Sequence, residues 1–137
     1  MSYLLDTDVL SQLQKRKPDG RVVEWLSSRR SEELHISVLS VGEVRRGATN
    51  LRDRGDRPQA LALERWVSDV QVMFADRIVP VSLEVADVWG GQGMRSVPPP
   101  IDGLIAATAI VHGLTMVTRN TKHFGLTGVR VVNPFGG

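Results

Sequence analysis

The sequence predicts an α/β fold in which helices cover a central, mostly parallel sheet of five strands. Short apolar runs alternate with longer amphipathic segments along the chain, which is the pattern of strand–helix–strand units. The length of 137 residues fits one compact domain, so we expect residues 1–137 to form a single domain. Apolar residues make up 42% of the chain and aromatic residues only 5%, so the core is expected to be aliphatic.

The strands are predicted from short apolar runs with few charged residues. The first is Tyr3-Leu4-Leu5, which ends at Asp6. Four similar runs follow it along the chain. The predicted strands are 3–5, 35–38, 78–81, 114–117 and 129–132.

Helices are predicted where apolar residues recur three and four positions apart. The first places Val9, Leu10 and Leu13 on one face and is followed by the helix breaker Pro18. The last, which is rich in alanine, is stopped by Gly113, a residue type that suits the left-handed position after a helix. The predicted helices are 7–14, 22–30, 40–50, 61–73, 83–89 and 101–112, and the predicted long loop is 90–100.

The composition excludes several kinds of site and location. The chain has no cysteine, which rules out disulfides, thiolate metal sites and a cysteine nucleophile. A net charge of +2 does not indicate a polybasic nucleic-acid binder, although the basic residues are mostly Arg, which suits phosphate groups. No apolar run approaches the roughly 20 residues of a membrane span, and no basic leader precedes the first strand. We therefore expect a cytoplasmic protein with no membrane partner.

Four polar residues are predicted to gather at one edge of the sheet. Asp6 directly follows the first strand, and Asn120 comes soon after the fourth. Glu43 lies near the start of the helix after the second strand, and Asp102 opens the Ala-rich helix. Ligands of parallel sheets bind beyond the carboxyl ends of the strands, where the strand order reverses. Carboxylates gathered there repel one another unless a cation lies between them, and such hard oxygen ligands suit Mg²⁺ or Mn²⁺.

Each of these residues also has a purely structural interpretation. Asp6 and Asp102 are good helix N-cap residues, and Asn120 suits the start of the short turn that follows it. A glutamate near the start of a helix, such as Glu43, interacts favourably with the helix dipole. The prediction of a site therefore depends on all four residues lying near the carboxyl ends of the strands, and not on any one of them.

Other residues with useful chemistry are expected to lie outside the site. None of the three histidines, His123 included, has ligand spacing to another, and no Ser–His–Asp arrangement is apparent. Asp8 is close to Asp6 in sequence, but helix geometry is expected to point its side chain elsewhere, so it is kept only as a secondary candidate. Thr118 is expected, at most, to orient a water molecule.

Four short blocks of the sequence resemble the motifs of a known family. They are Leu4-Leu5-Asp6-Thr7-Asp8-Val9-Leu10, Ser40-Val41-Gly42-Glu43-Val44-Arg45-Arg46-Gly47, Ile101-Asp102-Gly103-Leu104-Ile105-Ala106-Ala107-Thr108-Ala109 and Val117-Thr118-Arg119-Asn120-Thr121-Lys122-His123-Phe124. In this order and spacing they are similar to PIN-domain proteins, and most of all to VapC-type toxins, including the FitB-like branch. The resemblance spans nearly the whole chain and implies a PIN-like three-layer α/β/α sandwich.

The resemblance also implies an Mg²⁺-dependent endoribonuclease that is the toxin of a toxin–antitoxin pair and is neutralised by a cognate VapB-like antitoxin. The metal-binding aspartates of the family match Asp6 and Asp102, and its glutamate matches Glu43. The fourth position, often Asp, is Asn120 here, which lowers the negative charge of the site and puts a second tightly held metal ion in doubt. Such toxins usually form homodimers and contact operator DNA only through the antitoxin.

The hypothesis that follows is metal-assisted hydrolysis of an RNA phosphodiester bond. Asp6 and Asp102 hold Mg²⁺, which polarises the scissile phosphate and lowers the pKa of a bound water molecule. Glu43 orients that water or accepts its proton, and Asn120 positions the hydration shell of the ion. Arg119 is expected to meet negative charge that develops on the phosphate.

Two other functions fit parts of the sequence. The run Asp6-Thr7-Asp8 after an apolar strand also resembles the nucleophile motif of haloacid-dehalogenase-type phosphatases, in which Asp6 is phosphorylated and Asp8 acts as the acid. That family has a late acidic pair after a lysine, whereas no acidic residue follows Asp102 here. The other alternative is a weakly active or non-catalytic PIN protein that acts mainly as the partner of a DNA-binding antitoxin in an autoregulatory complex.

Overall fold

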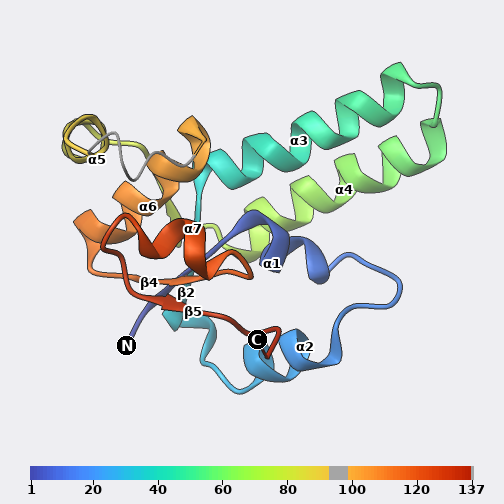
Figure 1. The fold of residues 1–137 in the computed structure, drawn as a ribbon. Coiled ribbons are helices and arrows are strands. Elements are labelled where there is room, and N and C mark those ends of the chain that lie inside the picture. The colour runs from blue at the N-terminus through green and yellow to red at the C-terminus, as the bar shows by residue number, and fades with distance from the viewer. Residues whose placement is uncertain (93–98, 137) are drawn as a thin grey trace.

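The computed structural model describes residues 1–92 and 99–136, and its centre is a five-stranded sheet (Figure 1). The strands are β1 (Tyr3–Leu5), β2 (Leu34–Ser37), β3 (Ile78–Val79), β4 (Thr115–Val117) and β5 (Val131–Val132). They lie in the order β3-β2-β1-β4-β5, and the pairing of each neighbouring pair is parallel. The predicted parallel sheet of five strands is therefore confirmed.

Helices connect these strands throughout the described ranges. They are α1 (Thr7–Gln12), α2 (Gly20–Ser27), the short 3₁₀ helix η1 (Ser31–Glu33), α3 (Val38–Asp53), α4 (Arg57–Met73), α5 (Leu83–Gly90), α6 (Pro100–His112) and α7 (Thr121–Gly125). In Figure 1, α3 and α4 lie side by side as a helical hairpin that extends beyond the sheet. Within residues 1–92 and 99–136, no helix has the length and apolar character needed to cross a membrane.

The side chains of β1 alternate between two apolar clusters, one on each face of the sheet. Tyr3 and Leu5 pack in a cluster with apolar residues of α1, α2 and α4. Leu4 packs in the other cluster, with apolar residues of α6 and α7. Leu4 and Leu5 are both fully buried. Helices therefore cover both faces, and the expected three-layer α/β/α sandwich is confirmed.

Some predicted helix ends differ from the observed ones, because capping residues determine where a helix begins and ends. The first helix is shorter than predicted, and Leu13, predicted to face the core, is the cap residue after it and is 40% exposed. The third helix begins earlier, because the Ser37 side chain accepts a hydrogen bond from the Leu39 N–H and caps it. Gly113 ends α6 with φ of 64°, the left-handed conformation predicted for it. Of the predicted loop 90–100, residues 93–98 lie outside the described residues.

Helices α5 and α6 approach each other closely at Gly103. A Cβ atom at this position would lie 3.0 Å from both Cδ1 and Nε1 of Trp89. The Trp89 indole therefore packs directly against the backbone of α6. Gln92 adds a second connection, because its Nε2 donates a hydrogen bond of 3.3 Å to the Gly103 carbonyl. These two contacts fix the start of α6 at the residue that follows Asp102.

Candidate functional site

The strand order reverses beside β1, the central strand of the sheet. The chain passes from β1 to β2 and β3 on one side and then returns to β4 and β5 on the other. The carboxyl ends of β1 and β4 therefore border the position where open parallel sheets bind ligands. Asp6 directly follows β1, and Thr118 directly follows β4. The Thr118 hydroxyl donates a hydrogen bond of 2.8 Å to Asp6 Oδ2 and joins the two strand ends.

Asp6 is a buried carboxylate with a hydrogen bond to each oxygen. Its Oδ1 accepts from the Thr7 backbone N–H at 2.8 Å and caps α1, and its Oδ2 accepts from Thr118. Asp6 is only 8% exposed, and this burial raises its pKa from the ordinary value of 3.8 to about 7. The nearby charge of Asp8 adds to the rise, and the two hydrogen bonds oppose it. Asp6 thus has the structural capping role and is also a candidate ligand.

Glu43 reaches the same region from the second turn of α3. The Thr7 hydroxyl donates a hydrogen bond of 2.5 Å to Glu43 Oε1 and shares a second hydrogen bond, of 2.9 Å, with the hydroxyl of buried Ser40. Burial raises the pKa of Glu43, the Thr7 hydrogen bond opposes this, and the charges of nearby acidic residues add to the rise. The helix dipole acts mainly within the first turn, so it does not account for a glutamate at this position.

Asp102 lies in the first turn of α6 and does not cap it. The cap position is Pro99, which makes no side-chain hydrogen bond to the helix. Burial raises the pKa of the Asp102 carboxyl, and a positive charge on His123 opposes that rise. The capping interpretation therefore fails for Asp102, and its carboxylate is free to face the site.

Asn120 lies at the edge of the site, with His123 beside it. The Asn120 backbone N–H donates to Thr118 Oγ1 at 2.9 Å, and its side-chain Nδ2 lies 3.0 Å from Nδ1 of His123. Asn120 precedes α7, but its side chain makes no capping hydrogen bond. His123 is half-buried and acts on the pKa of Asp102. His123 is not among the described residues that line the site, in agreement with its expected place outside it, although the turn of α7 brings it beside Asn120.

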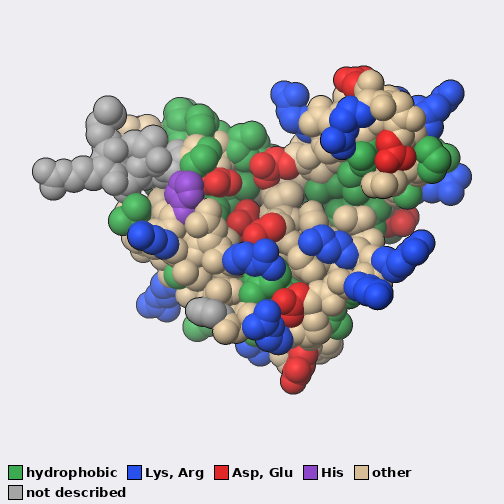
Figure 2. All heavy atoms as spheres, turned by 45° about the vertical axis from the view of Figure 1, so that its right-hand side comes forward, with side chains coloured by type: hydrophobic (Ala, Val, Ile, Leu, Met, Phe, Trp, Pro, Cys, Tyr) green, Lys and Arg blue, Asp and Glu red, His purple; other side chains and the backbone are tan. Residues whose placement is uncertain are grey.

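The four predicted residues line one cavity of about 450 Å³. Figure 2 shows acidic side chains gathered around a hollow near the middle of one face, with Lys and Arg side chains around it. The lining residues are Asp6, Thr7, Asp8, Ser11, Lys15, Glu43, Asp102 and Asn120. The structure therefore brings together side chains from the first helix, the third helix, the sixth helix and the segment after β4.

Two predictions about neighbouring residues were wrong. Asp8 lines the cavity, because α1 turns Val9 and Leu10 into the core and leaves Asp8 on the opposite side of the helix. Arg119 does not line it, because its guanidinium stacks 3.8 Å from the centroid of the Phe135 ring. The role of Thr7 was not predicted, although its position in sequence between two aspartates was a signal.

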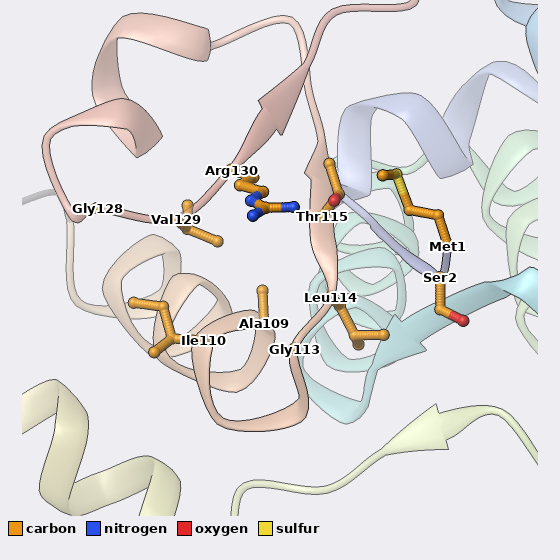
Figure 3. A pocket seen from close by; sticks show the side chains of 10 residues that line it. All are labelled: Met1, Ser2, Ala109, Ile110, Gly113, Leu114, Thr115, Gly128, Val129 and Arg130. Atoms are coloured by element: carbon orange, nitrogen blue, oxygen red, sulfur yellow. The ribbon is translucent and has the colours of Figure 1, made fainter.

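A second, larger cavity lies at the opposite edge of the sheet. Its volume is about 710 Å³, and it is formed by the end of α6 and by residues that precede β1, β4 and β5 or begin β4 (Figure 3). Its walls combine apolar side chains, such as Ala109, Ile110 and Leu114, with polar surface, and Arg130 is the one charged side chain among the described residues that line it. The described residues that line it include no Asp, Glu or His, so the larger volume of this cavity does not make it the candidate site.

The donor set of the acidic cavity fits a hard divalent cation with few direct protein ligands. In the described part of the chain, no group of three or more His, Asp or Glu side chains is close enough to hold a metal ion as it stands. Mg²⁺ keeps several water molecules and commonly binds through one or two carboxylates, which Asp6 and Asp102 supply. Both carboxyls have raised pKa values, so a cation beside them would stabilise their ionised forms.

Comparison with known proteins identifies the family. Residues 3–127 match the model of the PIN domain. The chain belongs to the PIN-domain family. This PIN domain is 33% identical to a VapC ribonuclease (Y4jK) of Sinorhizobium fredii, over 96% of either chain. It is 37% identical to the toxin FitB of Neisseria gonorrhoeae, over 96% of this chain and 97% of that protein. The family assignment leaves the phosphatase alternative without support.

A solved structure shows the same architecture. The structure of FitAB bound to an IR36 DNA fragment contains a chain that is 33% identical to this PIN domain, with a TM-score of 0.87. The match covers 98% of this chain and 96% of the other. The predicted PIN-like fold is therefore confirmed.

We expect Thr7→Val to raise the pKa of Glu43 further. Valine has nearly the shape of threonine but cannot donate the hydrogen bond that now favours the ionised carboxylate. The measurement is an NMR titration of the Glu43 side-chain carboxyl. Thr7→Ser, which keeps the hydroxyl, is the control and should titrate like the parent. An unchanged Glu43 pKa in Thr7→Val would show that the hydrogen bond does not hold this carboxylate in solution.

The metal-free protein is expected to lose stability as the pH rises from about 4 to about 7. The folded chain keeps a proton on Asp6 up to about pH 7, whereas the unfolded chain releases it near the ordinary pKa of 3.8. Because the folded state binds more protons in this range, raising the pH favours unfolding, and the loss is complete above pH 7. Glu43 and Asp102, whose pKa values are also raised, act in the same direction.

Urea unfolding in EDTA across this pH range measures the effect. Asp6→Asn should lose most of the pH dependence and be about 2–4 kcal/mol more stable than the parent near pH 8. Asn also remains a good helix N-cap, so the variant should fold. Asp69→Asn, on the exposed side of α4, is the control and should behave like the parent. Parallel pH profiles for the parent and Asp6→Asn would contradict a strongly raised pKa at Asp6.

Proposed function

We propose that this chain is a Mg²⁺-dependent endoribonuclease and the toxin of a type II toxin–antitoxin pair, with Mn²⁺ as the alternative ion. The observation that carries the proposal is the meeting of Asp6, Glu43 and Asp102 in one cavity at the reversal of the strand order. The names of the relatives, a VapC ribonuclease and the toxin FitB, support the same function. We further propose that residues 1–137 form a single PIN domain.

In this proposal the side chains of the cavity have separate roles. Asp6 and Asp102 hold the ion, and Thr118 keeps the Asp6 carboxylate in place through its hydrogen bond. When bound, the ion supplies positive charge to the scissile phosphate and lowers the pKa of a water molecule. Glu43, held by Thr7, orients the attacking water or takes its proton, and its raised pKa brings it closer to the range useful for a base near neutral pH. Asn120 contributes a neutral amide at the rim, where an aspartate would add charge.

The proposed partners follow from the charge of the cavity and from the relatives. An open cavity lined by four carboxylates attracts a basic segment of a VapB-like antitoxin when no RNA is present. The similar FitAB structure contains a DNA fragment, which supports contact with operator DNA through the antitoxin. We also propose that the chain forms a homodimer in this assembly.

Asp6→Asn is expected to abolish RNA cleavage and growth inhibition while leaving the fold intact. The substitution keeps the hydrogen bond that caps α1 but removes a charge that the metal ion requires. The measurement is cleavage of total RNA by the purified chain with Mg²⁺ and with EDTA, where we expect a loss of at least about 100-fold in rate.

Asp87→Asn is the matched control, because Asp87 is an exposed aspartate of α5 outside the cavity. It should cleave RNA at the parental rate. Full activity of Asp6→Asn, or cleavage by the parent in EDTA, would refute the proposed site. A parent that does not cleave RNA but still assembles with an antitoxin would instead favour the non-catalytic alternative.

The proposed assembly has its own measurement. Sedimentation of the purified chain should give twice its mass of 15.1 kDa. When the chain is produced with the product of the adjacent short gene, the two proteins should copurify, RNA cleavage should stop and the complex should retain operator DNA. A monomer that copurifies with no such product would contradict the proposed partners.

A further inference from the structure

One polar face of α1 extends from the acidic centre to the edge of the cavity. Asp8, Ser11 and Lys15 all line the cavity, and their spacing of three and four residues places them on one side of a helix. Helical turns continue beyond the end of α1, because the Gln14 and Lys15 N–H groups donate to the carbonyls three residues earlier, each at 3.3 Å. Lys15 therefore stays on the same face as Asp8.

Lys15 is the one positively charged side chain among the lining residues that the structure describes. Four carboxylates line the same cavity, yet none of the ion pairs in residues 1–92 and 99–136 includes Lys15. Its ammonium group is thus at the edge of the acidic centre without being held by it. The Ser11 hydroxyl, also on this face, has no side-chain hydrogen bond within the same ranges.

The loop that carries Lys15 is fixed at both ends. The Gln12 side chain is only 4% exposed, and its Oε1 accepts a hydrogen bond of 3.0 Å from the Asp19 backbone N–H. Asp19 in turn caps α2 by accepting from the Arg21 N–H at 2.9 Å. A buried glutamine thus closes residues 13–18 into a loop of set position. The place of Lys15 at the cavity edge follows from this closure.

We propose that Lys15 and Ser11 bind the phosphate next to the scissile phosphate of an RNA strand that lies in the cavity. Seven residues of helix separate Lys15 from Asp8, which is about 10 Å along the axis. Because the ammonium group makes no ion pair with these carboxylates in the described ranges, it does not take the place of a cation between them, and it meets the neighbouring phosphate instead. The Ser11 hydroxyl, between the two, donates a hydrogen bond to the same phosphate.

This inference rests on the proposed ribonuclease function and assigns Lys15 to substrate binding, not to the chemical step. A contact with a phosphate that does not react is made equally in the bound ground state and in the transition state. Its loss raises KM and leaves kcat unchanged. One lost phosphate contact also lowers the salt dependence of binding to a single strand, by about 0.7 in the slope of log affinity against log salt.

The experiment measures steady-state cleavage of a short fluorogenic single-stranded RNA at fixed Mg²⁺ and several KCl concentrations. We expect Lys15→Gln to raise KM about tenfold, to keep kcat within about twofold and to reduce the salt slope by about 0.7. Lys15→Arg, which keeps the charge, should recover most of the affinity, and Ser11→Ala should raise KM less. Lys17→Gln is the matched control, because Lys17 is exposed in the same loop but does not line the cavity.

The parent protein tests the proposed ribonuclease function, and the variants test the phosphate site. A parent that neither cleaves nor binds the RNA overturns the proposed function and this inference with it. If the parent cleaves, a Lys15→Gln variant with parental KM and salt slope overturns the phosphate site alone. A fall in kcat with unchanged KM also overturns it. If Lys15→Gln keeps the parental KM but no longer copurifies with a protein partner, this face of α1 binds a protein and not RNA, and the phosphate site is overturned.

Discussion

The hydrogen bond from Thr118 to Asp6 is the interaction on which the geometry of the site depends. It joins the ends of β1 and β4, the two strands between which the sheet reverses its order. The backbone repeats the connection, because the Asp6 N–H donates to the Val117 carbonyl at 2.9 Å. The Thr118 hydroxyl also accepts from the Asn120 backbone N–H, so one buried hydroxyl holds the side chain of Asp6 and the backbone of Asn120. Leaving such a group without its partner costs about 1–3 kcal/mol.

Electrostatic repulsion between the carboxylates of the cavity destabilises the surrounding fold. Asp6, Glu43 and Asp102 come from three different elements, and burial raises the pKa of each. A group of partly buried carboxylates is destabilising at neutral pH unless positive charge compensates for it. The apolar clusters on both faces of the sheet hold these residues in place despite the repulsion. A cation, an antitoxin side chain or an RNA-bound ion would each relieve it.

The sequence was sufficient for the sheet and for the four predicted residues, because strand ends are a simple topological signal. Asp6 and Asn120 could be placed from the apolar runs before them, and Asp102 from the Ala-rich helix. Asp8 was misplaced for a different reason. The pattern of α1 shows which side faces the core, but whether the other side meets solvent or a cavity depends on where α3 and α6 lie.

The remaining errors have a similar origin in long-range geometry. Thr7 was missed because its contact with Glu43 joins residues 36 positions apart in sequence. The stacking of Arg119 on Phe135 could not be inferred without the path of the C-terminal segment. Lys15 lies in a loop whose position depends on one buried glutamine side chain, and no periodic pattern reveals such a closure.

Because α5 and α6 approach each other closely, the neighbours Asp102 and Gly103 have two different roles. The aspartate belongs to the cavity, whereas the glycine belongs to packing, because a Cβ atom there would press on the Trp89 indole. A side chain at position 103 therefore requires the Trp89 indole to give way by a few tenths of an ångström, directly beside the residue that carries the Asp102 carboxylate. For the proposed ribonuclease, inactive variants can consequently arise at a residue that does not line the cavity. In related chains that also carry Asp–Gly here, the aspartate would be required by the chemistry of the cavity and the glycine by the close packing of the two helices.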